Sequence, residues 1–245
     1  TRASSGRCRE REKQNVPILA MTTFLALLTL AVLLLLGVRL WRTVDAHRGP
    51  DWGGPWLNRL DGLNRLLCRR YHRLPAVWLP LPDRGPVLLA SNHVSGLDPL
   101  LLVAASRRPL RFLIAREQYE RRGLQWLFRA AGCIPVDRAA RPEQALRAAL
   151  RALQAGEAVA LFPHGRIHLD SDPPRPIKPG VAWLAAQVRC PVVPARVEGV
   201  RAERHVTLAP FLRSRARIRT FPPIACAELG APECLARLET AIGNG

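Results

Sequence analysis

An uncharged run of 23 residues, from Val16 to Val38, constrains the fold of this chain more than any other feature. As a helix the run would be about 35 Å long, whereas the hydrocarbon core of a bilayer is about 30 Å thick. Because the run is apolar on every face, it is not typical of a helix on the surface of a soluble protein. Arg39 and Arg42 follow it directly, where a cleaved signal would carry small residues. The sequence therefore predicts a retained transmembrane helix over residues 16–38.

The only methionine, Met21, lies inside this run, and we hypothesise that translation begins there. Arg39, Arg42 and Arg48 would then mark the following side as cytoplasmic, because basic residues flank the cytoplasmic end of a span. The chain would be a single-pass protein of the cell inner membrane, with its larger part facing the cytoplasm. If the basic tail of residues 1–15 is retained, both flanks are basic and the orientation stays open. Peptides from residues 2–13 in the native protein would contradict the Met21 hypothesis.

The chain is strongly basic, with a formal net charge of +18 from 37 Lys and Arg against 19 Asp and Glu, nearly all of the cations being arginine. Such a surface attracts anions: nucleic acid, the headgroups of membrane lipids, or an acidic carrier protein. The sequence contains nothing that resembles a nucleic-acid-binding module or an aromatic stacking platform. We therefore expect membrane lipids as partners, and no nucleic acid.

Neither cysteine nor histidine spacing predicts a metal site or a cofactor. The histidines His164 and His168 are four residues apart, but Gly165 makes a helix there doubtful and no Cys or His cluster accompanies them. The cysteines contain no C-x-x-C and no regular framework, so they fit a reducing compartment, most of them as small buried residues. They are Cys8, Cys68, Cys133, Cys190, Cys226 and Cys234.

A second membrane signal lies in residues 56–77, within a juxtamembrane segment that we assign to residues 39–80. Apolar residues at helical spacing alternate with arginines; they are Trp56, Leu60, Leu63 and Leu67, and Arg59, Arg65, Arg69 and Arg70. The pattern fits a helix lying in the membrane interface. It fits equally well a surface helix that packs its leucines on the domain. The glycine- and proline-rich stretch of residues 45–55 reads as a connecting loop.

Residues 81–245 alternate short β-like runs with helical stretches, which predicts an α/β fold with a mostly parallel sheet flanked by helices. The expected strands are 87–90, 111–115, 133–136, 158–162 and 192–197, with a late strand in 213–221. The expected helices are 99–105, 124–131, 142–155, 181–188 and 232–242. In such a sheet, ligands bind at the carboxyl ends of the strands.

The corner after the first expected strand carries a histidine and a carboxylate, His93 and Asp98, five residues apart. On a continuous helix this step rotates by about 140°, so the two side chains would not share a face. A turn at Gly96 could let them meet. Asp98 would then fix the imidazole tautomer and leave the other nitrogen as a base for a hydroxyl. Alternatively, Asp98 caps the following helix and His93 hydrogen-bonds the turn.

Four ordered blocks give this corner a context. Asn92-His93-x4-Asp98 is followed by Gly132-Cys133-Ile134-Pro135-Val136-Asp137-Arg138, by Phe162-Pro163-His164-Gly165-Arg166-Ile167, and by Val193-Pro194-Ala195-Arg196-Val197. Their order and spacing, over about residues 85–200, resemble the glycerolipid acyltransferase family, whose best-known members acylate lysophosphatidic acid. The resemblance implies a glycerol-3-phosphate acyltransferase-like fold. It also implies an O-acyltransferase that moves a fatty acyl group from acyl-ACP or acyl-CoA to a lysophospholipid hydroxyl, with 1-acylglycerol-3-phosphate as the first choice of acceptor.

The resemblance also assigns roles to residues. His93 would be the base and Asp98 its partner, and backbone amides near Ser95 to Leu97 would stabilise the charge on the thioester oxygen. Arg138, Arg166 and Lys178 occupy or neighbour the positions that contact an acceptor phosphate. The further residues expected to bind substrate are Asn92, Ser95, Phe162, Pro163, His164 and Gly165.

The third block departs from the family pattern, which usually has glutamate at the position of His164 and commonly threonine and arginine at those of Arg166 and Ile167. A neutral histidine can hydrogen-bond an acceptor hydroxyl but cannot supply the charge of a carboxylate. Two alternatives therefore stay open. The acceptor could be a different lysolipid or an amine lipid, or the chain could be a lipid-binding relative with impaired catalysis.

Overall fold

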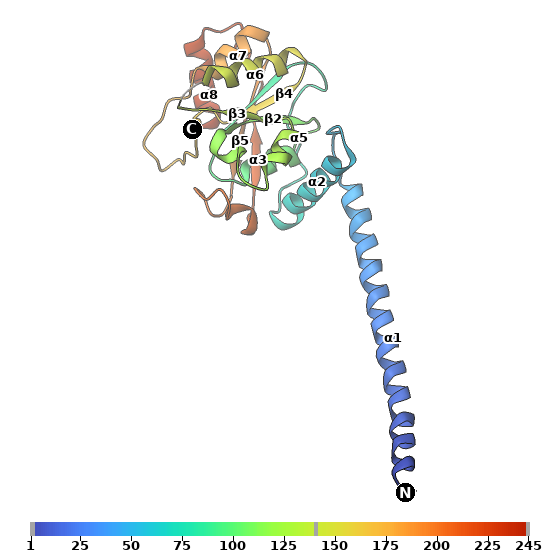
Figure 1. The fold of residues 1–245 in the computed structure, drawn as a ribbon. Coiled ribbons are helices and arrows are strands. Elements are labelled where there is room, and N and C mark those ends of the chain that lie inside the picture. Colours follow the sequence, from blue (N-terminus) through green and yellow to red (C-terminus); the bar gives the residue numbers. More distant parts are fainter. Residues whose placement is uncertain (1–2, 140–141, 244–245) are drawn as a thin grey trace. The chain divides into compact units, whose positions relative to one another are not determined.

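A computed structural model describes residues 3–139 and 142–243, so the first two residues of the predicted tail lie outside it. The chain divides into two compact units, residues 1–46 and 47–245. The first unit is one long helix, α1 (Ala3–Ala46), which extends the predicted helix at both ends (Figure 1). Its part Met21–Ala46 is long and apolar enough to cross a membrane, and none of it is buried in the protein.

The second unit is built on a six-stranded sheet with the strand order β3-β2-β4-β1-β5-β6. All neighbouring pairs are parallel except β5 and β6. The strands are β1 (Val87–Ser91), β2 (Leu110–Ala115), β3 (Ile134–Val136), β4 (Ala158–Leu161), β5 (Val192–Glu198) and β6 (Arg217–Thr220). The predicted α/β fold with a mostly parallel sheet is confirmed. The late strand is the antiparallel one, β6.

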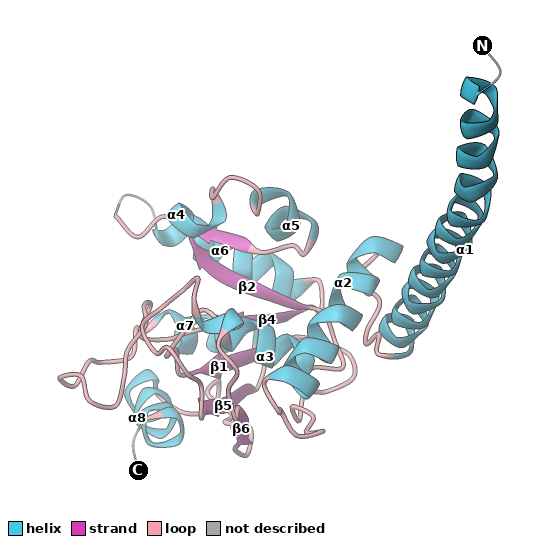
Figure 2. Ribbon diagram, turned by 90° about the horizontal axis from the view of Figure 1, so that it is seen from below, coloured by secondary structure: helices cyan, strands magenta, loops and turns pink. Residues whose placement is uncertain are grey.

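Helices cover both faces of this sheet (Figures 1 and 2). On one face lie α6 (Pro142–Gln154), α7 (Gly180–Val188) and α8 (Ala231–Ile242), which form one core cluster with Leu88 of β1. The other face carries α3 (Asp98–Ala104), which packs in a second cluster with Leu89. Short helices α4 (Arg116–Tyr119) and α5 (Gln125–Ala130) follow β2. Because successive strand residues point to opposite faces and helices cover both faces, β1 is apolar from Val87 to Ala90, and all five of its residues, Ser91 included, are buried.

The predicted amphipathic run forms helix α2 (Pro55–Leu66), continued by a π-helical turn, η1 (Leu67–Tyr71), six residues short of Val77. Its buried face is polar: Asp61 and Arg65 form an ion pair at 2.7 Å, with each side chain only 2% exposed. Arg65 also donates to the carbonyls of Val103, Ala104 and Ser106 at the end of α3. The Arg65 guanidinium thus supplies hydrogen-bond donors to carbonyl groups that have no partner within the helix at its carboxyl end.

Two apolar residues of α2 lie outward, with Trp56 70% and Leu63 49% exposed, whereas Leu57, Leu60 and Leu66 are half-buried. The exposed pair fits a helix in the membrane interface, and the half-buried leucines fit packing on the domain, so both interpretations stay open. The compact unit starts at His47. The predicted division between residues 80 and 81 is based on sequence pattern and stays a prediction.

The expectation that the cysteines are reduced is wrong for one pair, because Cys226 and Cys234 form a disulfide. The chain between β6 and α8 folds back and brings their Cα atoms to 5.1 Å, a separation that a disulfide spans. Burial raises the pKa of the Cys68 thiol to about 12 and that of Cys133 to about 11. Neither thiol is therefore ionised near neutral pH, which makes both poor nucleophiles.

Candidate active site

His93 and Asp98 meet where β1 ends and α3 begins. The imidazole Nδ1 lies 2.8 Å from Asp98 Oδ2. Asp98 is fully buried, whereas the His93 side chain is 19% exposed. The predicted contact is therefore present, with the carboxylate inside the protein and the imidazole at the surface.

The surroundings of Asp98 determine which imidazole nitrogen carries the proton. Oδ2 accepts the backbone N–H groups of Val94 and Ser95 at 2.7 and 2.8 Å, and Oδ1 accepts the Ser95 hydroxyl at 2.8 Å. A carboxylate surrounded by donors acts only as an acceptor, so Nδ1 donates to Asp98. The lone pair of His93 is then on Nε2, which is the tautomer that a general base needs.

Gly96 makes this turn possible by its lack of a side chain. A Cβ atom there would lie 1.8 Å from the carbonyl oxygen of Val206, and the Gly96 N–H donates to the His205 carbonyl at 3.2 Å. The loop after β5 thus packs directly against the corner. Glycine is needed at position 96 because two backbones approach each other closely there. This requirement comes from a segment distant in the sequence, so the residues around Gly96 do not reveal it.

We expect Gly96→Ala to destabilise the protein by about 3 kcal/mol or more, because backbone must move to admit the methyl group. Gly54→Ala is the matched control: a Cβ there meets nothing within 4 Å, and its backbone is extended. Because Gly54 is the N-cap of α2, where alanine is less favourable than glycine, we expect the control to cost about 1 kcal/mol or less. Urea unfolding of the two variants measures the difference, and equal midpoints would contradict the assigned role of Gly96.

The backbone amides expected to stabilise a thioester oxygen are already engaged, which corrects that part of the prediction. Ser95 N–H donates to Asp98, Gly96 N–H to the His205 carbonyl, and Leu97 N–H to the Ser95 hydroxyl. The turn uses these donors to hold its own shape. Ser95 is fully buried and its hydroxyl donates to Asp98, so it helps to hold that carboxylate; its predicted contact with substrate stays a prediction.

Two further predicted residues hold the corner in place. Asn92 is buried, and its amide bonds both the N–H and the carbonyl of Val197, at 2.7 and 2.9 Å, which ties the end of β1 to β5. We therefore assign it a positioning role in place of the predicted substrate contact. The Phe162 ring stacks on the His93 imidazole with centroids 4.0 Å apart. The third block of the sequence thus begins directly against His93.

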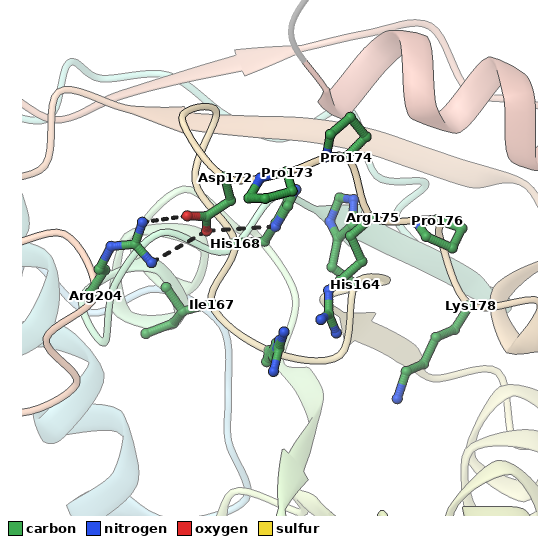
Figure 3. A pocket seen from close by; sticks show the side chains of 11 residues that line it. His164, Ile167, His168, Asp172, Pro173, Pro174, Arg175, Pro176, Lys178 and Arg204 are labelled. Atoms are coloured by element: carbon green, nitrogen blue, oxygen red, sulfur yellow. Dashed lines mark hydrogen bonds and ion pairs between the residues drawn. The ribbon is translucent and has the colours of Figure 1, made fainter.

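Three further residues of the third block, His164, Arg166 and Ile167, line a cavity of about 750 Å³, which we call the cationic cavity; Pro163 and Gly165 do not line it. His168 lines this cavity, and its backbone N–H donates to the backbone carbonyl of His93 at 2.8 Å. The cavity therefore lies next to the His93 corner. Four cations and one acid line it: Arg166, Arg175, Lys178, Arg204 and Asp172. Figure 3 shows Arg204 joined to Asp172 on one side and Lys178 on the opposite side. Among residues 21–139 and 142–243, whose side chains the structure describes, Arg166, Arg175 and Lys178 make no ion pair, so the cavity carries excess positive charge.

Gly165 and Pro163 set the position of Lys178. The Pro163 carbonyl accepts the Lys178 N–H at 3.1 Å, and a Cβ on Gly165, where φ is +75°, would lie 2.7 Å from the Lys178 ammonium. Arg138, by contrast, is not among the residues that line the cavity. It follows β3 at the edge of the sheet and faces Glu117 at 3.7 Å.

His164 is buried at the wall of the cavity, with Glu239 of α8 3.7 Å from its Nε2 atom. Burial lowers the pKa of His164, and the nearby Glu239 carboxylate opposes that effect only in part. His164 is therefore neutral at neutral pH. The carboxylate nearest to His164 thus comes from a residue 75 positions later in the sequence, and Glu239 itself does not line the cavity.

Comparisons with known proteins place this geometry in a family. A family model described as Acyltransferase matches residues 71–198. A probable 1-acyl-sn-glycerol-3-phosphate acyltransferase of Mycoplasma genitalium is 28% identical over 150 residues, which cover 54% of this chain and 55% of that protein. An N-acylphosphatidylethanolamine synthase of Arabidopsis thaliana is 32% identical over 123 residues, covering 46% and 43%. The chain spans about half the length of these curated relatives.

The fold has a counterpart among solved structures. The crystal structure of the 1-acyl-sn-glycerophosphate (LPA) acyltransferase PlsC from Thermotoga maritima matches with a TM-score of 0.57 and 18% identity, over 76% of this chain and 77% of that one. At this identity the match concerns the fold alone. The family model, however, covers more than half of the 245 residues and includes both His93 and Asp98. The protein therefore belongs to the acyltransferase family.

Proposed function

We propose that this protein moves a fatty acyl group from an acyl thioester, acyl-ACP or acyl-CoA, to the free hydroxyl of a lysophospholipid, with 1-acylglycerol-3-phosphate as the first candidate. The observation that carries the proposal is the hydrogen bond between His93 and the buried Asp98 beside a cavity with unpaired cations. The pair supplies a base for a hydroxyl, and the cations supply partners for a phosphate.

The reaction needs one proton to move twice. His93 Nε2 takes the proton of the acceptor hydroxyl as its oxygen attacks the thioester carbonyl carbon, and Asp98 stabilises the imidazolium. When the carbon–sulfur bond breaks, the thiolate leaves and takes the proton back from His93. The products are an ester and a free thiol. Both Cys68 and Cys133 are buried thiols of raised pKa, so no cysteine nucleophile is invoked.

We infer a membrane location from the first unit of the chain. The stretch Met21–Ala46 is long and apolar enough to cross a bilayer. The names of the related acyltransferases also point to lipid substrates. Arg39, Arg42 and Arg48 after the apolar run support a single-pass protein of the inner membrane whose catalytic part faces the cytoplasm. Labelling of an introduced surface cysteine from one side of sealed vesicles tests this orientation, and labelling from the periplasmic side would contradict it.

The function is tested by following free thiol and lipid product together. The full-length protein in mixed micelles receives acyl-CoA or acyl-ACP, with lysophosphatidic acid, with other lysophospholipids, or with phosphatidylethanolamine as an amine acceptor. We expect thiol release that depends on the acceptor and matches the ester formed. Thiol release with phosphatidylethanolamine alone would move the assignment to N-acylation. No acceptor-dependent release with any lipid would contradict the proposal.

The cations of the cavity give a second test, since they would bind the acceptor phosphate. We expect Lys178→Met to raise KM for lysophosphatidic acid by about tenfold or more and to change kcat little, because a phosphate contact made before and during reaction contributes to binding. Arg138→Gln tests a second of the three motif cations, which resemblance assigns to the same phosphate. Arg122→Gln, an exposed arginine outside the four blocks, is the matched control. An unchanged KM in Lys178→Met would exclude that lysine as the phosphate contact.

A further inference from the structure

A second cavity, of about 380 Å³, shares no lining residue with the cationic cavity or the His93 corner. We call it the arginine pocket. It is lined by Arg73, Gly199, Arg201, Arg213, Ser214 and Arg215. Four arginines, all of them exposed, thus contribute to the lining of one small space, and its described lining includes no acidic residue. None of the proposed chemistry uses this pocket.

Three segments far apart in the sequence build the pocket, and hydrogen bonds fix them to one another. Arg215 N–H donates to the Gly199 carbonyl at 3.2 Å, and Arg201 N–H donates to the hydroxyl of buried Ser214 at 3.0 Å. The backbone of Arg73 is left-handed, with φ of 54°, a conformation that costs free energy in a residue with a side chain. It is held there from both sides, because the His72 carbonyl accepts Ala216 N–H and the Leu74 N–H donates to Cys68.

Gly199 shows how closely these segments meet. Its φ is +70°, and a Cβ atom there would lie 2.3 Å from the carbonyl oxygen of Arg215. A larger residue would separate the loop after β5 from the chain before β6. The arrangement of the arginines therefore comes from a packed framework and not from a loose surface loop.

Other arginines of this chain pair with acids: Arg196 with Asp170 and Glu198, for example. None of the four pocket arginines makes an ion pair with any side chain that the structure describes, those of residues 21–139 and 142–243. A chain with 37 cations and 19 acids must leave many arginines unpaired, but four of them lining one cavity raise the positive potential there. An anion in the cavity would neutralise it, and guanidinium groups fit phosphate oxygens in pairs.

Exposed apolar side chains flank the same arginines. Phe211 is 74% and Leu212 37% exposed just before Arg213, and Tyr71 is 38% exposed just before Arg73. The Tyr71 hydroxyl donates to the Phe211 carbonyl at 2.6 Å, so the two segments lie side by side. A soluble phosphate compound has no apolar part that could contact these exposed side chains. A lipid presents a phosphate directly beside apolar chains, which matches cations beside aromatic and aliphatic side chains.

We propose that the arginine pocket binds the phosphate of an anionic phospholipid headgroup, while Phe211, Leu212 and Tyr71 enter the membrane surface around it. This site would dock the second unit of the chain on the bilayer independently of the catalytic pair. It is distinct from the site proposed for the acceptor phosphate, which lies in the cationic cavity.

The test measures lipid binding, not turnover, so that its outcome does not depend on the proposed activity. Full-length protein in a nonionic detergent is titrated with short-chain phosphatidylglycerol, with short-chain phosphatidylcholine and with inorganic phosphate, and Kd is measured calorimetrically. The variant Arg201→Gln/Arg213→Gln removes two pocket cations. The control Arg121→Gln/Arg122→Gln removes the same charge from an exposed turn outside both cavities.

We expect the pocket variant to weaken phosphatidylglycerol binding by about tenfold or more and the control to leave it unchanged. Equal weakening in the two variants, or none in either, would overturn the proposal. Inorganic phosphate binding as tightly as phosphatidylglycerol would overturn the lipid assignment and leave a free-phosphate site. If the pocket variant unfolds, Arg201→Lys/Arg213→Lys replaces it; this pair keeps the charge but loses the paired contacts, and unchanged binding to it would contradict bidentate recognition.

Discussion

Replacing His93 with alanine is expected to lower the turnover number between about 100-fold and 10,000-fold, the range that a positioned general base contributes. Asp98→Asn is expected to act in the same direction. An amide can present an N–H group to Nδ1, which would favour the imidazole tautomer with its proton on Nε2 and so remove the base. Asp98 also accepts the Val94 and Ser95 amides, so this variant is expected to lose some stability as well.

The measurement is acceptor-dependent release of thiol by purified full-length protein, with the binding of lysophosphatidic acid measured separately. His205→Ala is the matched control, because its exposed side chain is outside the His93 network and only its carbonyl contacts Gly96. Affinity for the acceptor should be nearly unchanged in His93→Ala, since the base acts on the reaction step. Wild-type turnover in both His93→Ala and Asp98→Asn would refute the catalytic assignment.

Asp61→Asn is expected to cost about 3–5 kcal/mol of stability, because it leaves the charge of Arg65 buried without its carboxylate. The two side chains are only 2% exposed, so water cannot replace the lost partner. Asparagine has nearly the same shape, which separates the effect of charge from that of packing. Asp61 also accepts the Gly49 N–H at 2.8 Å, a bond that the amide oxygen can keep.

The matched control is another acid–arginine pair with the same spacing. Glu233 and Arg237 also stand four residues apart in a helix, but their side chains are more than half exposed. Glu233→Gln should therefore cost less than about 0.5 kcal/mol. Urea unfolding followed by tryptophan fluorescence compares the two variants. If both shift the midpoint equally, the buried pair contributes no more than a surface pair, and the proposed role of Asp61 in fixing α2 on α3 is wrong.

Local patterns predicted most of the fold, because strands and helices here follow their own apolar spacing. The central strand β1 and helix α7 were found almost to the residue. The contact of His93 with Asp98 was also predictable, since the two residues are only five positions apart, at a corner that contains Gly96. The π-helical turn η1 was not predicted, since its geometry depends on packing against the chain around Ala216 and Leu74.

The parts that sequence reasoning missed depend on contacts between distant segments. Arg204 and Glu239 reach the site from the loop after β5 and from α8, and no local pattern marks either of them. Asp172 and Arg175 belong to a proline-rich stretch between His168 and Lys178, a signal that could have drawn attention to them. The amides of Ser95 to Leu97 looked available only because their internal partners cannot be read from a linear sequence.

The stacking of Phe162 on His93 has a consequence for the speed of each catalytic cycle. An imidazole fixed at one nitrogen by a carboxylate can still swing about that bond, and every swing away from the acceptor delays the transfer of its proton. A flat aromatic ring against its face removes most of this freedom when the chain folds. With a smaller residue at position 162 the proposed reaction steps would be the same, but the His93 imidazole would spend less time in the orientation that accepts the proton, and turnover would be slower.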